Sequence, residues 1–330
     1  MRTQARFPSV RPDEGHYESF YLKAAAPEGG RAVWIRHTIH KRPGADPTGA
    51  VWMTWFDHDR PGPVAAKQQV GPELITTPAK SYVRVGESEI APGRVQGLVA
   101  DNGTHSSWNL RFTDHDGPLR HFPAEWMYER SLPRTKLLSP HPSASFDGIL
   151  DVAGERVSLE SWPGMIGHNW GTEHAATWIW IHGATVGDDG SRGYVDLGGG
   201  RIGLGPILSP WVVNGEIVHG GERFRVGGLG EILRTRVRTE TTRCRFTVGG
   251  EHLTARGTVA GPREQFVGWL YADPSGPGHH SLHCSIADLE VVVSRPGRPD
   301  LTFRVDGGAT YELGTRKTDH GIPIQPYADG

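Results

Sequence analysis

The chain has 330 residues, of which 22% are charged, and its formal net charge is −2. This balance excludes a bulk electrostatic attraction to nucleic acid or to an anionic membrane. The amino terminus lacks the apolar core of a signal peptide, and no apolar run reaches the roughly eighteen residues needed to cross a membrane. The sequence therefore predicts a soluble, cytoplasmic protein without stable membrane insertion, and it leaves the oligomeric state open.

The chain contains two cysteines, Cys244 and Cys284. So few cysteines suit a reducing compartment at least as well as secretion. Nothing in their spacing decides whether they pair.

Short apolar runs separated by turn residues predict an all-β protein. The chain has 45 glycines and 25 prolines, spread without a period between these runs. A helical turn is expected over 123–131, and amphipathic helices of three turns are absent. In chain order, the expected strands before the central stretch are 18–23, 32–40, 50–57, 82–85, 94–99, 107–113, 146–152 and 155–159. After it we expect 193–197, 201–204, 211–213, 216–219, 222–226, 232–239, 244–248, 253–259, 266–271, 281–294, 301–305 and 310–313. This spacing is typical of antiparallel sandwiches and barrels.

The stretch 164–183 (GMIGHNWGTEHAATWIWIHG) combines glycines, tryptophans and histidines and marks the candidate site. Its second part alternates, so Trp178, Trp180 and His182 should share one face of a strand. Indole and imidazole N–H groups need partners when buried, which favours the wall of a pocket over a dry core. We expect Trp170 near the mouth of that pocket.

A polar cluster, His168, Asn169, Glu173 and His174, precedes the aromatic strand beside an expected Gly-rich turn. In one interpretation these side chains only satisfy the backbone groups of the turn. In the other, an imidazole pairs with Glu173 and tunes a proton donor in an apolar cavity. The sequence leaves both open, and we name Glu173, His168 and His174 as candidate catalytic residues.

A second aromatic strand ends in another candidate group. Trp269 and Tyr271 alternate on it, and the turn that follows places Asp273 and His280 at its end. We expect Asp273 to be a further catalytic candidate. Trp269, Tyr271 and His280 join Asn169 and the central aromatic residues as candidate ligand-binding residues.

Three other patterns have simpler interpretations. The run 198–203 (GGGRIG) matches a dinucleotide fingerprint, but Pro206 and Pro210 exclude the helix that such a site needs. The histidines fit no metal motif in their spacing, so no metal ligand is assigned. Alternating Arg234, Arg236 and Arg238 predict a solvated face, with an anion site as the alternative.

At 168–171 (HNWG), preceded by 161–164 (SWPG) and followed by Trp178, Ile179 and Trp180, the chain resembles the lipocalin-like superfamily of carotenoid 1,2-hydratase (hydroxyneurosporene synthase). That superfamily includes AttH-type proteins, fungal Diels–Alderase-like cyclases and, remotely, tocopherol cyclase. The resemblance implies two lipocalin-like (calycin) antiparallel β-barrel or sandwich domains in tandem, which we place at 1–185 and 186–330. Family members often carry a carboxylate within the Trp-Gly box, whereas this chain has Gly167, His168 and Asn169 there. The nearest acid is Glu173.

The resemblance also implies an activity. It points to a hydrophobic small molecule, terpenoid, polyene or polyketide-like, bound in an aromatic cavity without a cofactor. Aromatic faces stabilise a developing cation, and a buried carboxylic acid with a raised pKa can donate a proton. We expect an enzyme of hydratase, isomerase or cyclase type. The alternatives are a non-catalytic carrier of a lipophilic ligand and a metal-dependent enzyme that uses the histidine cluster.

Overall fold

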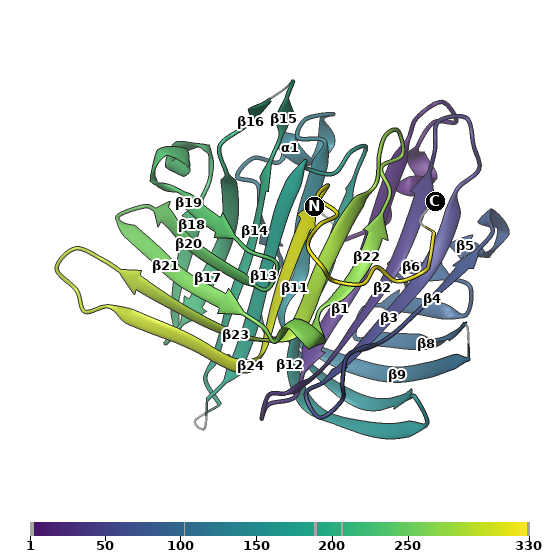
Figure 1. The fold of residues 1–330 in the computed structure, drawn as a ribbon, viewed down its shortest axis with the longest axis horizontal. Helices are drawn as coiled ribbons and strands as arrows, with labels where there is room; N and C mark the ends of the chain where they lie inside the picture. Colours follow the sequence, from purple (N-terminus) through teal and green to yellow (C-terminus); the bar gives the residue numbers. More distant parts are fainter. Residues whose placement is uncertain (1–2, 102, 188–189, 206, 329–330) are drawn as a thin grey trace.

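The computed structural model describes residues 3–101, 103–187, 190–205 and 207–328. Strands make up 61% of the residues and helices 6%, and the strands form two large antiparallel sheets (Figure 1). One sheet is a nearly closed barrel and the other a half-barrel. The all-β, two-barrel prediction is confirmed.

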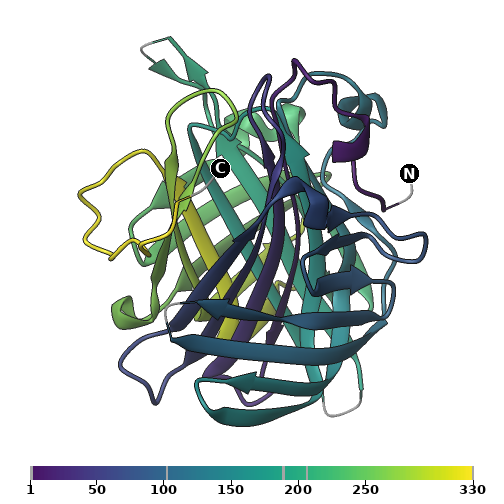
Figure 2. The same cartoon turned by 90° about the vertical axis from the view of Figure 1, so that its right-hand side faces the viewer.

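The first sheet has twelve strands in the order β4-β3-β2-β1-β12-β11-β9-β8-β7-β6-β5, with β10 paired to β11. Figure 2 views the molecule from the side of this sheet. The strands are β1 (His16–Ala25), β2 (Arg31–Lys41), β3 (Thr48–Asp57), β4 (Val64–Val70), β5 (Ile75–Thr76), β6 (Val83–Val85), β7 (Ser88–Ala91), β8 (Arg94–Asp101), β9 (Thr104–Asp114), β10 (Leu119–Arg120), β11 (Thr135–Val152) and β12 (Glu155–Gly171).

The second sheet has ten strands in the order β18-β17-β14-β13-β24-β23-β21-β20-β19, with β22 paired to β23. These are β13 (Thr177–Val186), β14 (Arg192–Arg201), β17 (Val212–His219), β18 (Glu222–Gly227), β19 (Arg236–Thr239), β20 (Arg243–Gly250), β21 (Leu253–Ala260), β22 (Val267–Tyr271), β23 (His279–Ser294) and β24 (Leu301–Thr315). A small separate hairpin is formed by β15 (Gly203–Leu204) and β16 (Ile207–Leu208).

The two sheets repeat one topology. In each, the first strand pairs with the last, β1 with β12 and β13 with β24. The aromatic strand β13 therefore belongs to the second sheet, although the division expected at residue 185 puts it in the first half. The chain changes sheets between Gly171 and Thr177. The sequence pattern shows that β13 is a strand, but it does not show with which strands it pairs.

The expected Gly-rich turn before the aromatic strand is wrong. Residues 164–171 continue β12 and pair with β1, Gly167 opposite Tyr21 and Gly164 opposite Ala24. A Cβ atom at Gly167 would lie 2.1 Å from the Tyr21 ring, so the glycine makes room for an aromatic side chain. Strands β11 and β12 are joined by a tight hairpin at Ala153 and Gly154, with both residues in the left-handed region.

Helices are few and short. The predicted helical turn is confirmed as α1 (Trp126–Glu129), and four 3-10 turns occur at η1 (Phe7–Ser9), η2 (Pro72–Leu74), η3 (Leu229–Arg234) and η4 (Arg263–Gln265). The strand expected over 232–239 is wrong in its first part, where η3 precedes β19. None of the helices in the described ranges has the length and apolar character that crossing a bilayer requires.

Strand β2 is buried on both of its faces, and each face contributes to a different core cluster. Val33, Ile35 and Ile39 point into the first barrel, whereas Trp34 packs with the apolar residues of the second half. The wall of the first barrel thus also covers the second sheet. Cys244 and Cys284 are buried and do not form a disulfide, and burial raises the pKa of both thiols to about 12.

Stability should fall in mild acid because of His37. This imidazole points into the first barrel, fully buried and with neither ring nitrogen hydrogen-bonded, and burial lowers its pKa from 6.5 to about 3. Between these values the unfolded chain binds more protons, so acid favours unfolding. From neutral pH to about pH 5, His37→Leu should gain about 2 kcal/mol of unfolding free energy relative to the wild type. Urea titrations at several pH values measure it, and parallel pH dependences would contradict the assignment.

Candidate functional site

A cavity of about 510 Å3 lies between the two sheets. This volume is in the range of sites for small molecules. From the first sheet, β1, β2, β11 and β12 contribute to its wall, and from the second β13, β14, β17, β22 and β24. The connections around α1 and after β12, the start of the small hairpin and η3 complete it. The lining includes Ser19, Tyr21, Trp34, Arg36, Asn169, Glu173, His174, Trp178, Trp180, Tyr271 and Glu312.

Aromatic rings form much of this wall. Trp178 and Trp180 alternate on β13, as predicted, and both line the cavity. Trp178 stacks on Tyr271 with ring centroids 5.9 Å apart, and Trp180 meets Tyr21 edge to face at 5.1 Å. Burial raises the pKa of Tyr21 well above its ordinary value, so its phenol stays protonated. The aromatic rings therefore give the wall an apolar surface, and their indole and phenol groups offer hydrogen-bond donors at the ring edges.

Arg36 brings a positive charge into this aromatic surrounding. Its side chain is 5% exposed, and its guanidinium lies 3.9 Å from the centroid of the Tyr271 ring. Two of its nitrogen atoms, Nε and Nη1, are buried without a hydrogen-bond partner among the described residues. Because buried N–H groups without partners are costly, these two groups are candidate donors to an anion or carbonyl oxygen in the cavity.

Glu312 is the carboxylate of the cavity wall. It accepts hydrogen bonds from Trp178 Nε1 (2.8 Å) and Tyr271 Oη (3.5 Å), and lies 3.1 Å from His283 Nδ1. Burial acts to raise the pKa of Glu312, but the interactions with His283, Trp178 and Arg36 together outweigh it and the pKa is lowered. Glu312 is therefore ionised near neutral pH. It orients the Trp178 indole, and it does not supply the raised-pKa acid that the resemblance implies.

His174 and Asp273 form a dyad at the edge of the cavity. His174 Nδ1 lies 2.7 Å from Asp273 Oδ1, and the His174 backbone N–H donates to the same oxygen at 2.8 Å. The imidazole stacks on Tyr17 at 3.9 Å and lines the cavity. Its Nε2 is buried without a hydrogen-bond partner in the described ranges. A carboxylate on Nδ1 fixes the imidazole tautomer and leaves Nε2 to exchange protons.

A third buried group, His279, adjoins the dyad. Its Nδ1 lies 3.7 Å from Asp273 Oδ2, and its Nε2 is 3.0 Å from Arg316 Nε. Burial and the neighbouring His174 lower the pKa of His279 to about 4, so it is neutral. Burial acts to raise the pKa of Asp273, but the hydrogen bond with His174 holds it below its ordinary value. The dyad carboxylate is thus ionised.

The same three residues offer donor atoms that suit a metal ion. One atom each from His174, Asp273 and His279 lie within 4.8 Å of one another. Two imidazoles and one carboxylate are a known ligand set for zinc or iron. The Arg316 guanidinium, however, lies 3.7 Å from Asp273 Oδ2 and already supplies a positive charge there. The geometry therefore favours the hydrogen-bonded dyad over a metal centre.

Several predicted residues lie outside the lining of the cavity. His168 and Trp170 occupy the opposite face of β12, where His168 Nε2 lies 2.7 Å from Glu18 Oε1 and Trp170 packs on Tyr128. Burial lowers the pKa of His168 although Glu18 opposes this shift. Trp170 thus does not stand at the mouth, because successive residues of a strand face opposite sides.

Three further predicted residues are also held away from the cavity. His182 is fully buried, with Nε2 3.1 Å from the Pro142 carbonyl oxygen. Trp269 packs on Trp52 in the core, and His280 Nδ1 lies 2.8 Å from His320 Nε2.

Glu173 and Asn169 do line the cavity. Asn169 Oδ1 accepts a hydrogen bond from Ser19. The Glu173 carboxylate is 36% exposed and forms an ion pair with Arg134 at the cavity mouth. The pairing of an imidazole with Glu173, expected from the sequence, is thus replaced by the pairing of His174 with Asp273.

The glycine run of β14 also belongs to the wall. Gly198, Gly199 and Gly200 line the cavity within a strand, so they form neither a turn nor a phosphate loop. A Cβ at Gly198 would lie 2.3 Å from Leu137. The glycines leave space that side chains would otherwise fill.

Fold and cavity together define an antiparallel β protein, built of a nearly closed barrel and a half-barrel, with an aromatic chamber between its two sheets. No protein-family profile matches the chain. An uncharacterized protein of Mycobacterium tuberculosis, Rv0493c in strain H37Rv and MT0513 in strain CDC 1551, is 27% identical over 330 residues, 95% of this chain and 91% of its own length.

Three solved structures share the fold. An AttH-type protein of Nitrosomonas europaea superposes with a TM-score of 0.55 at 15% identity, over 94% of this chain and 96% of its own. Kievitone hydratase of Nectria haematococca gives 0.50 at 8%, over 90% and 88%. CghA with Sch210972 gives 0.50 at 13%, over 91% and 89%. These likenesses confirm the lipocalin-like fold that the HNWG segment indicates.

Proposed function

We propose that the cavity binds an apolar small molecule carrying a carbonyl or carboxylate oxygen, and that His174 moves a proton on it. The proposed reaction is a hydration, isomerisation or cyclisation of an alkene. The observation that carries this proposal is the unpartnered, buried Nε2 of a histidine that a carboxylate orients. Kievitone hydratase, which shares the fold, gives independent support for the hydratase class.

Arg36 and His174 form the two polar ends of the cavity, and their spacing suits such a substrate. Tyr271 lies between them: its ring is 3.9 Å from the Arg36 guanidinium and 5.9 Å from the His174 ring. A ligand oxygen held by Arg36 would leave the adjoining alkene over the aromatic wall and within reach of His174. Charge that develops on the oxygen would be stabilised by Arg36, and positive charge on carbon by the faces of Trp178 and Tyr271.

The proton balance follows from the dyad. Doubly protonated His174 donates its Nε2 proton to an alkene carbon, while its Nδ1 proton stays on the imidazole in the hydrogen bond to Asp273. Water then adds to the neighbouring carbon and returns a proton to Nε2, which completes a hydration. Loss of a proton from an adjacent carbon to Nε2 completes an isomerisation instead. In a cyclisation, a second alkene attacks the cation and closes a ring, and the resulting ring cation loses a proton to Nε2. Glu173 is the less favoured donor because it is ion-paired with Arg134.

The test starts from the molecule that the protein retains. Solvent extraction of the purified protein, followed by mass spectrometry, should release an apolar compound with an oxygen function. Incubated with fresh protein, that compound or its unsaturated precursor should change, either by the mass of one water or in retention time at constant mass. Return of the compound unchanged would support a carrier. Stoichiometric zinc or iron in the protein would instead support a metal centre at His174, Asp273 and His279.

A further inference from the structure

The exposed apolar side chains of the protein gather at one end of the molecule. Among the described residues, seven of the ten exposed large apolar side chains come from three neighbouring segments: the α1 region, the β15–β16 hairpin and η3. Figure 1 shows α1 and the hairpin at the same end, and Figure 2 shows the hairpin projecting beyond the barrels there. We call this set the apolar rim: Trp126, Leu132, Ile202, Ile207, Leu208, Leu229 and Leu233.

The apolar rim surrounds the opening of the cavity. Leu132, Ile202 and Leu229 line the cavity, yet they are 62%, 57% and 67% exposed. Residues that face both the chamber and solvent stand at its entrance. Trp126 precedes Met127, another lining residue, and is 56% exposed. An apolar ligand that enters the cavity passes these side chains.

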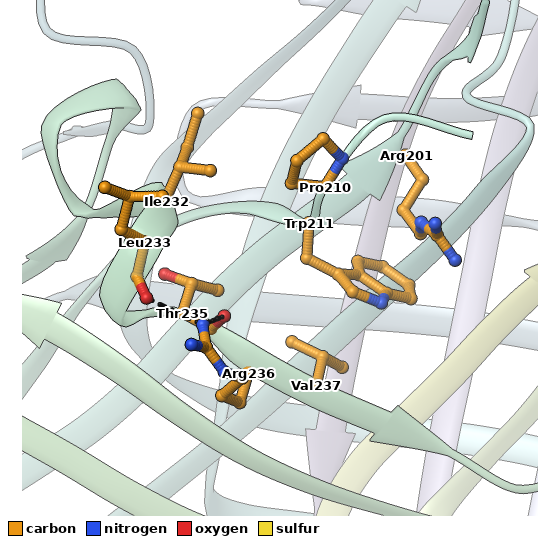
Figure 3. A pocket seen from close by; sticks show the side chains of 8 residues that line it. All are labelled: Arg201, Pro210, Trp211, Ile232, Leu233, Thr235, Arg236 and Val237. Carbon is orange, nitrogen blue, oxygen red and sulfur yellow. Dashed lines mark hydrogen bonds between the residues drawn. The ribbon is translucent and has the colours of Figure 1, made fainter. Parts of the chain in front are cut away.

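A shallow groove of about 390 Å3 extends the rim on one side. Figure 3 shows Ile232 and Leu233 on one side of it, and Pro210, Trp211 and Arg201 on the other. Leu233 is the most exposed large apolar side chain of the described residues, at 86%. Such side chains on separate short loops suit insertion into a deformable medium better than a fit to a rigid protein surface.

Positive charge accompanies the apolar rim. Arg130, Arg201 and Arg236 belong to the rim segments and form no ion pair among the described residues. Arg201 and Arg236 donate to backbone carbonyls of these segments, and the one carboxylate of the rim without an ion pair there is Glu129 of α1. The other rim arginines are paired, Arg134 with Glu173 and Arg234 with Glu231. Arginines without a carboxylate partner, next to exposed leucines and a tryptophan, give the rim a positive balance that suits binding to anionic lipid.

We propose that the apolar rim docks on an anionic lipid surface, so that the cavity exchanges its apolar ligand directly with the membrane. The docking is peripheral, with leucine and tryptophan side chains at the headgroup level and arginines on lipid phosphates. This inference rests on the proposed function only in taking the cavity ligand to be apolar.

The experiment is flotation of the protein with vesicles. Wild type should float with vesicles of equal parts phosphatidylcholine and phosphatidylglycerol, and much less with phosphatidylcholine alone. Leu233→Glu combined with Ile207→Glu should lower the bound fraction about tenfold, because both side chains lie on the rim and neither lines the cavity. Leu74→Glu is the matched control: Leu74 is 48% exposed but lies on η2, outside the rim, so binding should stay at the wild-type level.

Two results would overturn the proposal. One is equal flotation of the wild type and the double variant. The other is a wild type that ignores vesicles but forms a dimer that the double variant loses, which would make the rim a contact between copies. Binding of a fluorescent apolar probe in the cavity, measured without vesicles, is a separate readout. Its loss would count against the proposed function and not against the docking.

Discussion

Replacing His174 with glutamine should lower turnover of the retained ligand at least about 100-fold, the usual contribution of a general acid–base group. Glutamine keeps a side chain of similar length but cannot shuttle a proton. Asp273→Asn should lower turnover by a similar factor, because an amide does not hold the Nδ1 proton as a carboxylate does. Rates are measured by mass spectrometry of the converted compound, with probe binding and melting temperature as checks on folding.

The matched control for His174→Gln is His280→Gln. His280 is a half-buried histidine that pairs with His320 and does not line the cavity. Its substitution should leave turnover within about twofold of wild type, the level of an uninvolved surface change. Full activity of His174→Gln, or equal losses in both variants, would remove His174 from the mechanism. Glu173→Gln adds a comparison: a loss as large as that of His174→Gln would restore the acid named from the sequence.

The second large effect concerns Arg36. Arg36→Met should weaken binding of pyrenebutyrate about 100-fold, because a buried charged hydrogen bond to the carboxylate is lost. Pyrenebutanol has the same ring system and chain without the charge, so its affinity should change less than about threefold. Fluorescence titration of both probes measures the two affinities. The melting temperature of the same variant is measured as a check on folding, because the Arg36 charge also acts on the buried Glu312 carboxylate.

The pair of probes makes this result selective. If both probes lose affinity equally, the substitution has altered the shape of the cavity and not its charge. If neither loses affinity, Arg36 does not face the ligand, and the oxygen-binding end of the site lies elsewhere. Trp178 and Trp180 would then be the remaining contacts of known position.

Much of the fold could be predicted from the sequence, because strand alternation and turn residues are local signals. The same alternation placed Trp178 and Trp180 on one face, and both line the cavity. It could not show that His182, two residues further along β13, lies beyond the end of the chamber and bonds the Pro142 carbonyl. The extent of a cavity along a strand depends on the neighbouring strands, which the pattern does not identify.

The most informative site residues missed by the sequence analysis are Arg36 and Glu312. Both belong to strand segments without a functional motif, 33–36 (VWIR) and 310–313 (TYEL), and they are about 280 positions apart. The available signal was a charged residue on the same strand face as a buried aromatic residue, because Arg36 follows Trp34 by two positions on β2. In most barrels that face is solvated. Here it is covered by the second half of the molecule, which local sequence does not reveal.

Asp273 and His174 were named separately, and the structure joins them. They are 99 residues apart, one after β12 and one after β22, and their contact depends on how the two sheets meet. In one of the two interpretations of the sequence, an imidazole of the same polar cluster pairs with Glu173. In the structure, its carboxylate turns toward Arg134. The position of Asp273 after an aromatic strand was thus a better indication of the partner of His174 than the adjacency of Glu173 along the chain.

Exchange of hydrogen between solvent and the bound ligand tests the central claim most directly. The retained compound is incubated with the protein in deuterium oxide and analysed by mass spectrometry. Transfer of a proton from His174 to an alkene carbon predicts deuterium on carbon with wild-type protein, and none above the protein-free rate with His174→Gln. A wild type that leaves every carbon-bound hydrogen of the ligand unexchanged, or a variant that exchanges as fast as the wild type, would contradict it.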